Sequence, residues 1–504
     1  MNIAILRDKL QPRTNVGLWL PIILAEICLA AIGTLLPLKP MIIILIGIPL
    51  VFYLFSKPFH AYLLAILLLP FWEVTLRGTG DVEGQMDLRY TQIATAVAVL
   101  SWLLNGLITK KLYFGKNILN FSIAILIGWM LFSFFWTVNV NLGIRQFLLT
   151  LYGIGVFFLT INSVTDEKTL NIALKVWIIA GLLCALSGLF ELIATTLPAV
   201  KNLPLGTITH WGDPVRISGF REGPHRLGFL LNACLMMAVP QLITSKSRKY
   251  KLFLIFCIFS MLVVLANTMS RSAWIGCFVG IAGCSFYSKR LAKTFFISCF
   301  VVLVLFVALT PDALQHAIVE RFKGVVNPLE TTSIAGRENV WEAGMKMFRE
   351  RPLTGVGIGS FSVLSTPYGS VHLEAPHNVY LFFLSEFGLI GLSIFLVIIF
   401  TIVTSIIKGL KYISNDANKF VLFGLFAGLI IYFTQGIVVS YKFLEMEIWA
   451  LLGLTTVALK IFISQEEKIK GSLHPAENPS TKNFVQYNYE NKDLTEQINE
   501  KDTT

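Results

Sequence analysis

The chain has 504 residues, of which 55% are hydrophobic and 14% charged, and its mean hydropathy is +0.70. These values exclude an ordinary soluble domain and predict an all-α polytopic membrane protein. The net charge of +11 does not point to nucleic acid as a partner, because the lysines gather in short connections between apolar runs, at 246–251, 289–290 and 408–411.

Apolar stretches recur along the chain, and each is long enough to cross the roughly 30 Å hydrocarbon layer as a helix. They predict a bundle over residues 17–463 with about 12–14 transmembrane helices. The expected spans are 17–37, 39–56, 59–72, 89–108, 119–137, 144–162, 170–197, 227–243, 252–269, 272–287, 294–310, 379–407, 419–439 and 446–463. Prolines interrupt the first three, at Pro37, Pro40, Pro58 and Pro70, and mark either kinks or breaks between helices.

Positive charge predicts the orientation of these helices, since lysine and arginine accumulate in cytoplasmic connections. The lysine-rich connections then place residues 1–16 and the tail in the cytoplasm and two long loops, 198–226 and 311–378, on the outer side. The tail, 464–504, is polar and poor in apolar residues, which is typical of disorder. The expected location is a bacterial cytoplasmic (inner) membrane.

Within the larger loop, residues 337–350 have the pattern of an amphipathic helix. Val340, Trp341, Gly344, Met345 and Phe348 share one face, and Glu338, Asn339, Glu342, Lys346 and Arg349 share the other. The pattern predicts a surface helix that lies against the membrane or the bundle and ends before Pro352. Glycines at 355, 357 and 359 follow, and we interpret them as a turn, because their spacing does not match a phosphate-binding loop.

The predicted outer loops contain more arginine than lysine. They hold Arg216, Arg221, Arg226, Arg321, Arg337, Arg349 and Arg351 against Lys201, Lys323 and Lys346. Arg271 adds a guanidinium where two spans meet, a position at which charge is costly without a partner. Arginine binds phosphate oxygens through two-pronged hydrogen bonds, so the loops predict an anionic ligand. The alternative is that these arginines bind lipid headgroups or pair with acidic residues of the same loops.

Residues 375–392 place His377 and Asn378 at the mouth of a spanning segment. Near a helix N-terminus the dipole favours a neutral imidazole, which can accept a proton from a hydroxyl group. The alternative role of His377 is to cap the helix. Gly388 and Gly391 are expected on one helix face, about three turns below the histidine.

Other acidic and histidine residues suggest two further kinds of site. His372, Glu374 and His377 do not have the spacing of a zinc-binding helix, so no metal is predicted. Glu26, Glu191 and Glu386 lie within spans and are the proton-relay groups expected of a transporter or flippase for an anionic or lipid-linked saccharide. Glu386 is expected to pair with another helix, because it lies about half a turn round from His377.

These segments together resemble the superfamily of O-antigen ligases and Wzy-type polysaccharide polymerases. The resemblance depends on Ser270 with Arg271, on residues 337–361, on His377 with Asn378, and on Gly388. It extends over about residues 216–392 and predicts an O-antigen ligase-like motif region at 227–407.

The resemblance implies a metal-independent, GT-C-like glycosyltransferase without a cofactor. Its donor would be a glycan linked to undecaprenyl diphosphate in the membrane lipid, and a flippase and a chain-length regulator would be partners. Arg271, Arg337, Arg216 and Arg221 would bind the diphosphate. His377 would deprotonate or orient the acceptor sugar hydroxyl for an inverting attack, with Asn378, Gly388 and Gly391 in support.

Polymerase and ligase both remain open. The ligases commonly carry Arg-x-x-x-Leu in the large loop, whereas Trp341 stands four residues after Arg337 here. This departure and the compact loop favour a polymerase.

Overall fold

The computed structural model describes residues 49–71, 90–110, 112–114, 117–196, 216–221, 223–287, 332–370, 376–437 and 445–473, with single positions at 47 and between 289 and 304. All the regular elements in these ranges are helices, so the predicted fold class is confirmed. The predicted spans 17–37 and 294–310 lie outside the described elements, as do half of 39–56 and the residues Glu26, Arg321, His372 and Glu374.

Nine of the described helices are long and apolar enough to cross a membrane. They are α5 (Tyr90–Thr109), α6 (Ile118–Phe132) with the 3-10 helix η2 (Ser133–Trp136), α7 (Val140–Ser163), α8 (Glu167–Thr196), α10 (Pro224–Thr244), α11 (Arg248–Asn267), α17 (Val379–Tyr412), α18 (Asp416–Gln435) and α19 (Met446–Leu473). α12 (Arg271–Tyr287) has 17 residues, at the short end for a span. The predicted spans coincide with these helices to within several residues, although α19 continues to Leu473, past the predicted start of the tail at 464.

The first described segment shows that the proline pattern marks a real break. Residues Pro49–Ser56 and α4 (Pro58–Leu67) meet at a bend of 115° and together form one candidate span. Pro58 occupies the first turn of α4, where its missing N–H costs no helical hydrogen bond. The short 3-10 helix η1 (Leu69–Phe71) follows and includes Pro70.

Side chains of asparagine and serine fix the starts of several helices. Asn117, Asn139, Ser247 and Asn415 each accept a hydrogen bond from a backbone N–H in the first turn of α6, α7, α11 and α18. Such N-caps satisfy donors that have no partner within the helix. The polar residues that interrupt the apolar runs therefore set the points at which the chain turns.

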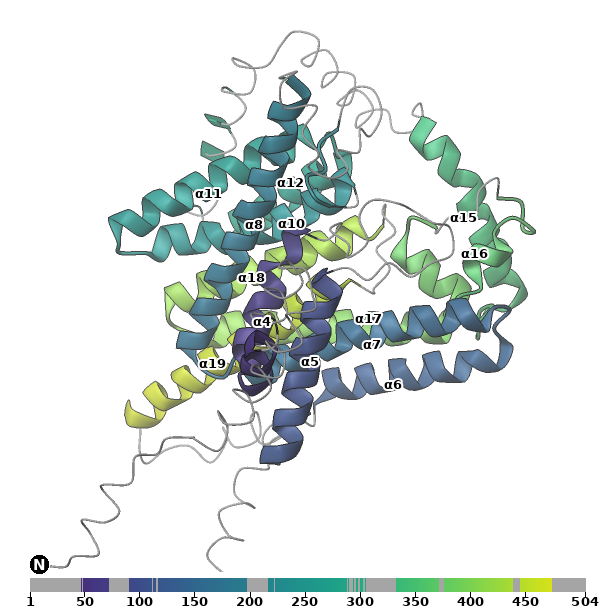
Figure 1. Ribbon diagram of the computed structural model, residues 1–504, viewed down its shortest axis with the longest axis horizontal. Coiled ribbons are helices and arrows are strands. Elements are labelled where there is room, and N and C mark those ends of the chain that lie inside the picture. Colours follow the sequence, from purple (N-terminus) through teal and green to yellow (C-terminus); the bar gives the residue numbers. More distant parts are fainter. Residues whose placement is uncertain are drawn as a thin grey trace, which may run out of the picture.

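α10 and α19 form the centre of the bundle, since 78% and 83% of the residues in their 18-residue apolar stretches are buried. α10 contacts α8, α11, α12 and α18, whereas α19 contacts α7, α17 and α18. Figure 1 shows α8, α10, α11 and α12 as one group and α6, α7 and α17 as another. α18 contacts members of both groups and so joins them.

α15 (Thr332–Glu350) is the surface helix that the sequence predicts, and it begins five residues before the predicted start at 337. All the residues expected on its polar face are exposed, and Val340, Ala343, Gly344 and Met347 are buried. It packs against α17, and the short helix α16 (Phe361–Leu364) lies beside it (Figure 1). Of the two surfaces against which the sequence allows this helix to lie, the membrane and the bundle, α15 therefore contacts the bundle.

α17 is not the continuous helix that the sequence predicts, because it breaks at Gly388 (φ 66°, ψ −166°). The break leaves backbone groups without helical partners, and residues 352–357 supply them. Val356 N and Gly357 N each donate to α17 carbonyls over 2.9 Å, to those of Ser385 and Glu386. In return, Leu389 N donates to the Pro352 carbonyl over 2.8 Å.

Gly388 and Gly391 therefore do not lie on one regular helix face. A Cβ at Gly388 would lie 2.3 Å from the Leu353 carbonyl oxygen, so this close approach requires glycine. Buried, irregular backbone at membrane depth is tolerated only when its polar groups are paired, as they are here.

Gly388→Ala is expected to destabilise the protein by about 3 kcal/mol or more, because the new Cβ meets backbone and the positive φ becomes strained. The apparent melting temperature of purified protein in detergent measures this effect. Gly128→Ala on α6 is the matched control, because a Cβ there meets nothing within 4 Å. A Gly388→Ala protein as stable as the control would contradict this account of the break.

Candidate functional site

A tight turn between α11 and α12 places Arg271 at the first position of α12. Met269 has a positive φ of 50°, and Thr268 and Ser270 are buried. The hydroxyl groups of Ser270 and Ser272 lie 3.2 Å apart across the helix start. Arg271 is half-buried and is the first residue of α12. A helix N-terminus favours an anion, so this position combines two sources of positive charge.

Arg216 lies against the same turn. Its Nε donates to the Thr268 carbonyl over 3.3 Å, and Ile217 N donates to the Asn267 carbonyl over the same distance. Arg216 is therefore bonded to a residue, Thr268, that precedes Arg271 by three positions in the chain. The structure brings these two predicted arginines together.

The end of α18 joins α12 to α17. Gln435 Nε2 donates to the Ser272 carbonyl over 2.9 Å, and Val379 N donates to the Gly436 carbonyl over 2.8 Å. Two neighbouring residues of α18 thus bond to the first turns of both helices. Arg271 and His377 consequently lie at helix starts that are both bonded to the end of α18, although more than one hundred residues separate them in sequence.

Asn378, and not His377, caps α17. The Asn378 side chain accepts from Tyr380 N over 2.9 Å and from Leu381 N over 3.0 Å. His377 precedes this cap with a φ of 49°, a conformation that few non-glycine residues adopt and that is enriched at functional sites. The N-cap of α17 is therefore Asn378, and the imidazole that precedes it is half-buried.

Trp341 fixes α15 next to His377. Its indole Nε1 donates to the Pro376 carbonyl over 2.7 Å, immediately before the histidine. Arg337 lies four residues before Trp341, on the same helix face, and is half-buried. We call Arg216, Arg271, Arg337 and His377 the arginine–histidine site, because these contacts bring their backbone segments to one end of the bundle.

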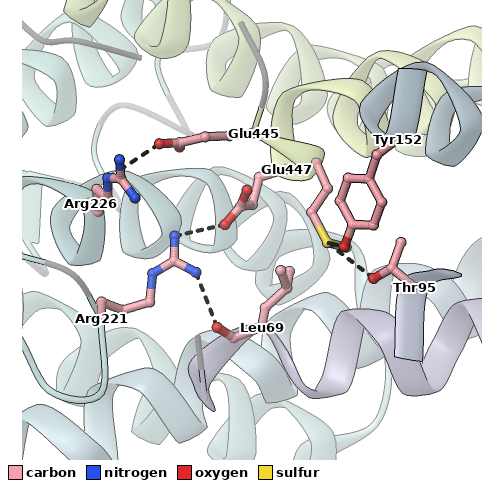
Figure 2. Close-up of polar contacts among 8 residues, drawn as sticks. Leu69, Thr95, Tyr152, Arg221, Arg226, Glu445 and Glu447 are labelled. Atoms are coloured by element: carbon pink, nitrogen blue, oxygen red, sulfur yellow. Dashed lines mark hydrogen bonds and ion pairs between the residues drawn. The ribbon is translucent and has the colours of Figure 1, made fainter. Parts of the chain in front are cut away.

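Arg221 has partners unlike those expected of a diphosphate ligand. It is 3% exposed, and it donates from Nη2 to Glu447 Oε1 over 2.7 Å and from Nη1 to the Leu69 carbonyl over 3.1 Å (Figure 2). Arg226 forms a second ion pair nearby, 3.3 Å from Glu445. Burial is the largest single influence on the pKa of Arg221 and would lower it, but Glu447, Cys184 and Glu445 together outweigh burial and raise this pKa above its ordinary value.

This pair connects α19, η1 and the segment that carries Arg216, so we assign Arg221 to holding that segment. The acidic partners found among the described residues, Glu445 and Glu447, lie at the start of α19, whereas the ion-pair alternative expected partners within the loops. The choice of partner depends on tertiary contacts more than two hundred residues apart, which no local sequence pattern shows.

Arg221→Ala and Glu447→Ala are each expected to lower the free energy of unfolding by about 3–5 kcal/mol, because either change leaves a buried charge without its partner. Thermal unfolding in detergent measures the loss. Replacing both residues by apolar ones, in Arg221→Met with Glu447→Leu, should recover most of it. Lys346→Ala, which removes an exposed pair with Glu342, is the control and should change little. Single variants as stable as this control would contradict the assignment.

Glu191 and Glu386, two of the three acidic residues expected to act as proton relays, bind backbone amides. Glu191 accepts from Ser218 N over 2.8 Å and from Gly219 N over 2.6 Å. Glu386 pairs with α7 through Gln146, as expected of a residue facing another helix, and also accepts from residues 359 and 361. Both carboxylates therefore bind other segments of the chain. Their presence within spans was the reason to consider a transporter, and these structural contacts weaken that reason.

Gln435 and Trp341 are the contacts that the sequence did not identify as part of the site. Gln435 is a buried amide in an apolar span, and polar residues at such positions are costly unless they bond to another segment. That signal was present in the sequence. Trp341 was placed on the buried face, but its bond to the Pro376 carbonyl depends on how the loop folds back.

A comparison with protein families finds a match over residues 256–396 to the model described as O-antigen ligase. This part of the chain is similar to the O-antigen ligase family. The match includes α12, α15 and the first half of α17, so Arg271, Arg337, His377 and Gly388 all fall within the matched residues. Arg216 and α18 lie outside it. No curated protein matches the chain. The family match supports an O-antigen ligase or polymerase type of function and agrees with a multi-pass membrane protein.

Proposed function

We propose that the protein is a membrane glycosyltransferase that moves a glycan from an undecaprenyl-diphosphate carrier to a sugar hydroxyl. The observation that carries this proposal is the junction at the end of α18, where Gln435 and Gly436 bond to the first turns of α12 and α17. It brings a guanidinium and an imidazole from distant segments to one end of a membrane bundle. Such a pair suits a reaction with an anionic leaving group and a hydroxyl nucleophile.

Electrostatics support a diphosphate at this place. Arg271 begins α12, Val379 begins α17, and the start of α10 packs beside α12, since a Cβ at Gly228 would lie 2.5 Å from that of Ala273. Each helix N-terminus carries partial positive charge from the helix dipole, although the first N–H groups of α17 are already bonded to Gly436 and Asn378. Together with Arg216 and Arg337, they form a positive environment fixed before substrate arrives, which is how a protein stabilises charge that develops in a transition state.

The proposed reaction is a single displacement with inversion. The acceptor oxygen forms a bond to the anomeric carbon while the bond from that carbon to the diphosphate oxygen breaks. The electron pair of the broken bond leaves with undecaprenyl diphosphate, and Arg271, Arg337 and Arg216 stabilise its charge. His377 accepts the hydroxyl proton. No metal ion or cofactor takes part in this proposal.

The lysine-rich ends of the helices support an outward-facing site. Lys246 follows the end of α10, Lys251 lies in the first turn of α11, and Lys408 and Lys411 lie at the end of α17, opposite its start at Val379. Because lysine-rich ends face the cytoplasm, the arginine–histidine site would face outward from the inner membrane. Donor glycans delivered by a flippase would reach it there, and a chain-length regulator would act on the product.

The test uses purified protein in liposomes with a fluorescent oligosaccharide linked to undecaprenyl diphosphate. We expect a new glycosidic bond and one undecaprenyl diphosphate released for each bond, in the presence of a chelator. Lipid-linked glycan as acceptor would identify a polymerase, and lipid A core as acceptor a ligase. Movement of the lipid across the bilayer without any new bond would instead establish a transporter or flippase.

A further inference from the structure

Glu386 lies at the point where three segments meet. It is 1% exposed, although it stands within a membrane-spanning helix. Its carboxylate accepts from Gln146 Nε2 on α7 over 2.7 Å, and from Phe361 N and Gly359 N over 3.1 and 3.2 Å. A buried carboxylate is costly unless several donors surround it, and these donors come from two other parts of the chain.

The segment that Glu386 holds is the direct continuation of α15. Residues 351–360 leave the end of α15 and run along the break in α17, where backbone bonds join them to Ser385 and Glu386. The same segment contacts the turn between α6 and α7, since Val138 N donates to Ser360 Oγ over 3.0 Å. A Cβ at Gly359 would lie 2.4 Å from Gly143 N, so the contact with α7 is also close.

We propose that Glu386 is a positioning residue, which holds α15 against α17 and so sets the place of Arg337 relative to His377. α15 is tied to α17 at two places: Trp341 bonds to the residue before His377, and the segment after α15 bonds to Glu386. Because α15 is bonded to α17 at two separate places, it cannot rotate about either contact. This proposal rests on the proposed function, because it concerns the geometry of that same site.

The carboxylate, and not merely a side chain of its size, is what the geometry requires. Gln146, Gly359 and Phe361 each present an N–H donor to the carboxylate, so an amide at position 386 would turn one N–H toward another. Glu386→Gln preserves volume and removes this acceptor capacity. Exchanging the two partners, in Glu386→Gln with Gln146→Glu, restores a donor facing an acceptor between α17 and α7.

The experiment combines steady-state kinetics with hydrogen exchange of the backbone amides at 356–361. For Glu386→Gln we expect kcat to fall by about 10- to 100-fold, because small misplacements of reacting groups have effects of that size. The KM for the lipid-linked donor should change by less than about threefold, and the amides of residues 359 and 361 should exchange faster. The double exchange should recover part of kcat and of the protection.

Glu342→Gln, on the exposed face of α15, is the matched control and should leave kcat and exchange unchanged. Should Glu386→Gln not fold, Gln146→Met removes a single donor and should still lower kcat at an unchanged KM. Normal kcat and exchange in Glu386→Gln, or a change in KM alone, would overturn the positioning role. A wild-type protein that forms no glycosidic bond would instead refute the proposed function, and the exchange data would still report on the contact.

Discussion

His377→Ala is expected to lower the rate of glycan transfer by about 10²- to 10⁴-fold, the range that a positioned general base contributes. His377 lies directly before the cap of α17 and next to the carbonyl that Trp341 holds, so its place depends on two other residues. Removing the imidazole leaves intact the arginines that we propose bind the donor. The loss should therefore appear in kcat, while the KM for the donor changes little.

His60→Ala serves as the control for this variant. His60 is exposed on α4 and bonds to Tyr53, away from the proposed site. It should transfer glycan at the wild-type rate when protein levels are matched. Wild-type transfer by His377→Ala membranes would remove the histidine from the mechanism.

Arg271→Ala and Arg337→Ala are each expected to lower transfer by about 10²- to 10³-fold, as the loss of one donor to a developing anion does elsewhere. Lysine at either position keeps the charge but loses the two-pronged geometry, so we expect it to recover only part of the rate. The rate of undecaprenyl diphosphate release from a fluorescent donor measures both effects.

Arg349→Ala is the matched control for Arg337→Ala, because both residues lie on α15 and Arg349 is on its exposed face. A general loss of surface charge would affect both variants. A specific contact with the leaving group would affect Arg337→Ala alone. Equal rates for the two variants would show that Arg337 does not contact the diphosphate.

The helices could be predicted from the sequence because their cause is local. An apolar run of about twenty residues has few alternatives in a bilayer, and its polar interruptions form caps such as Asn139 and Asn415. The amphipathic pattern of residues 337–350 was confirmed in the same way, because a helix exposes whichever face is polar.

The break in α17 could not be predicted, because an apolar sequence with two glycines is also compatible with a straight helix. What fixes the break is residues 352–357, which supply the hydrogen bonds that the helix loses at Gly388. Those partners approach from another part of the chain. The buried ion pair of Arg221 was hidden for the same reason, because its partner Glu447 is far away in sequence.

The predicted site was better founded where position and residue type agreed. Arg271 stands at a helix start in the sequence and in the structure, and His377 precedes one. The number of arginines in a loop was a weaker guide, since it could not separate Arg216, which bonds to the turn before Arg271, from Arg221, which is buried in an ion pair.

The central claim is that the arginines and the histidine act on one reacting bond. A double-mutant cycle on the transfer rate, with His377→Ala, Arg271→Ala and the combined variant, tests it most directly. Residues that act as a unit show strongly non-additive losses, so we predict that the combined variant loses much less than the product of the two single losses. Losses that multiply would contradict the account and place the two residues in independent roles.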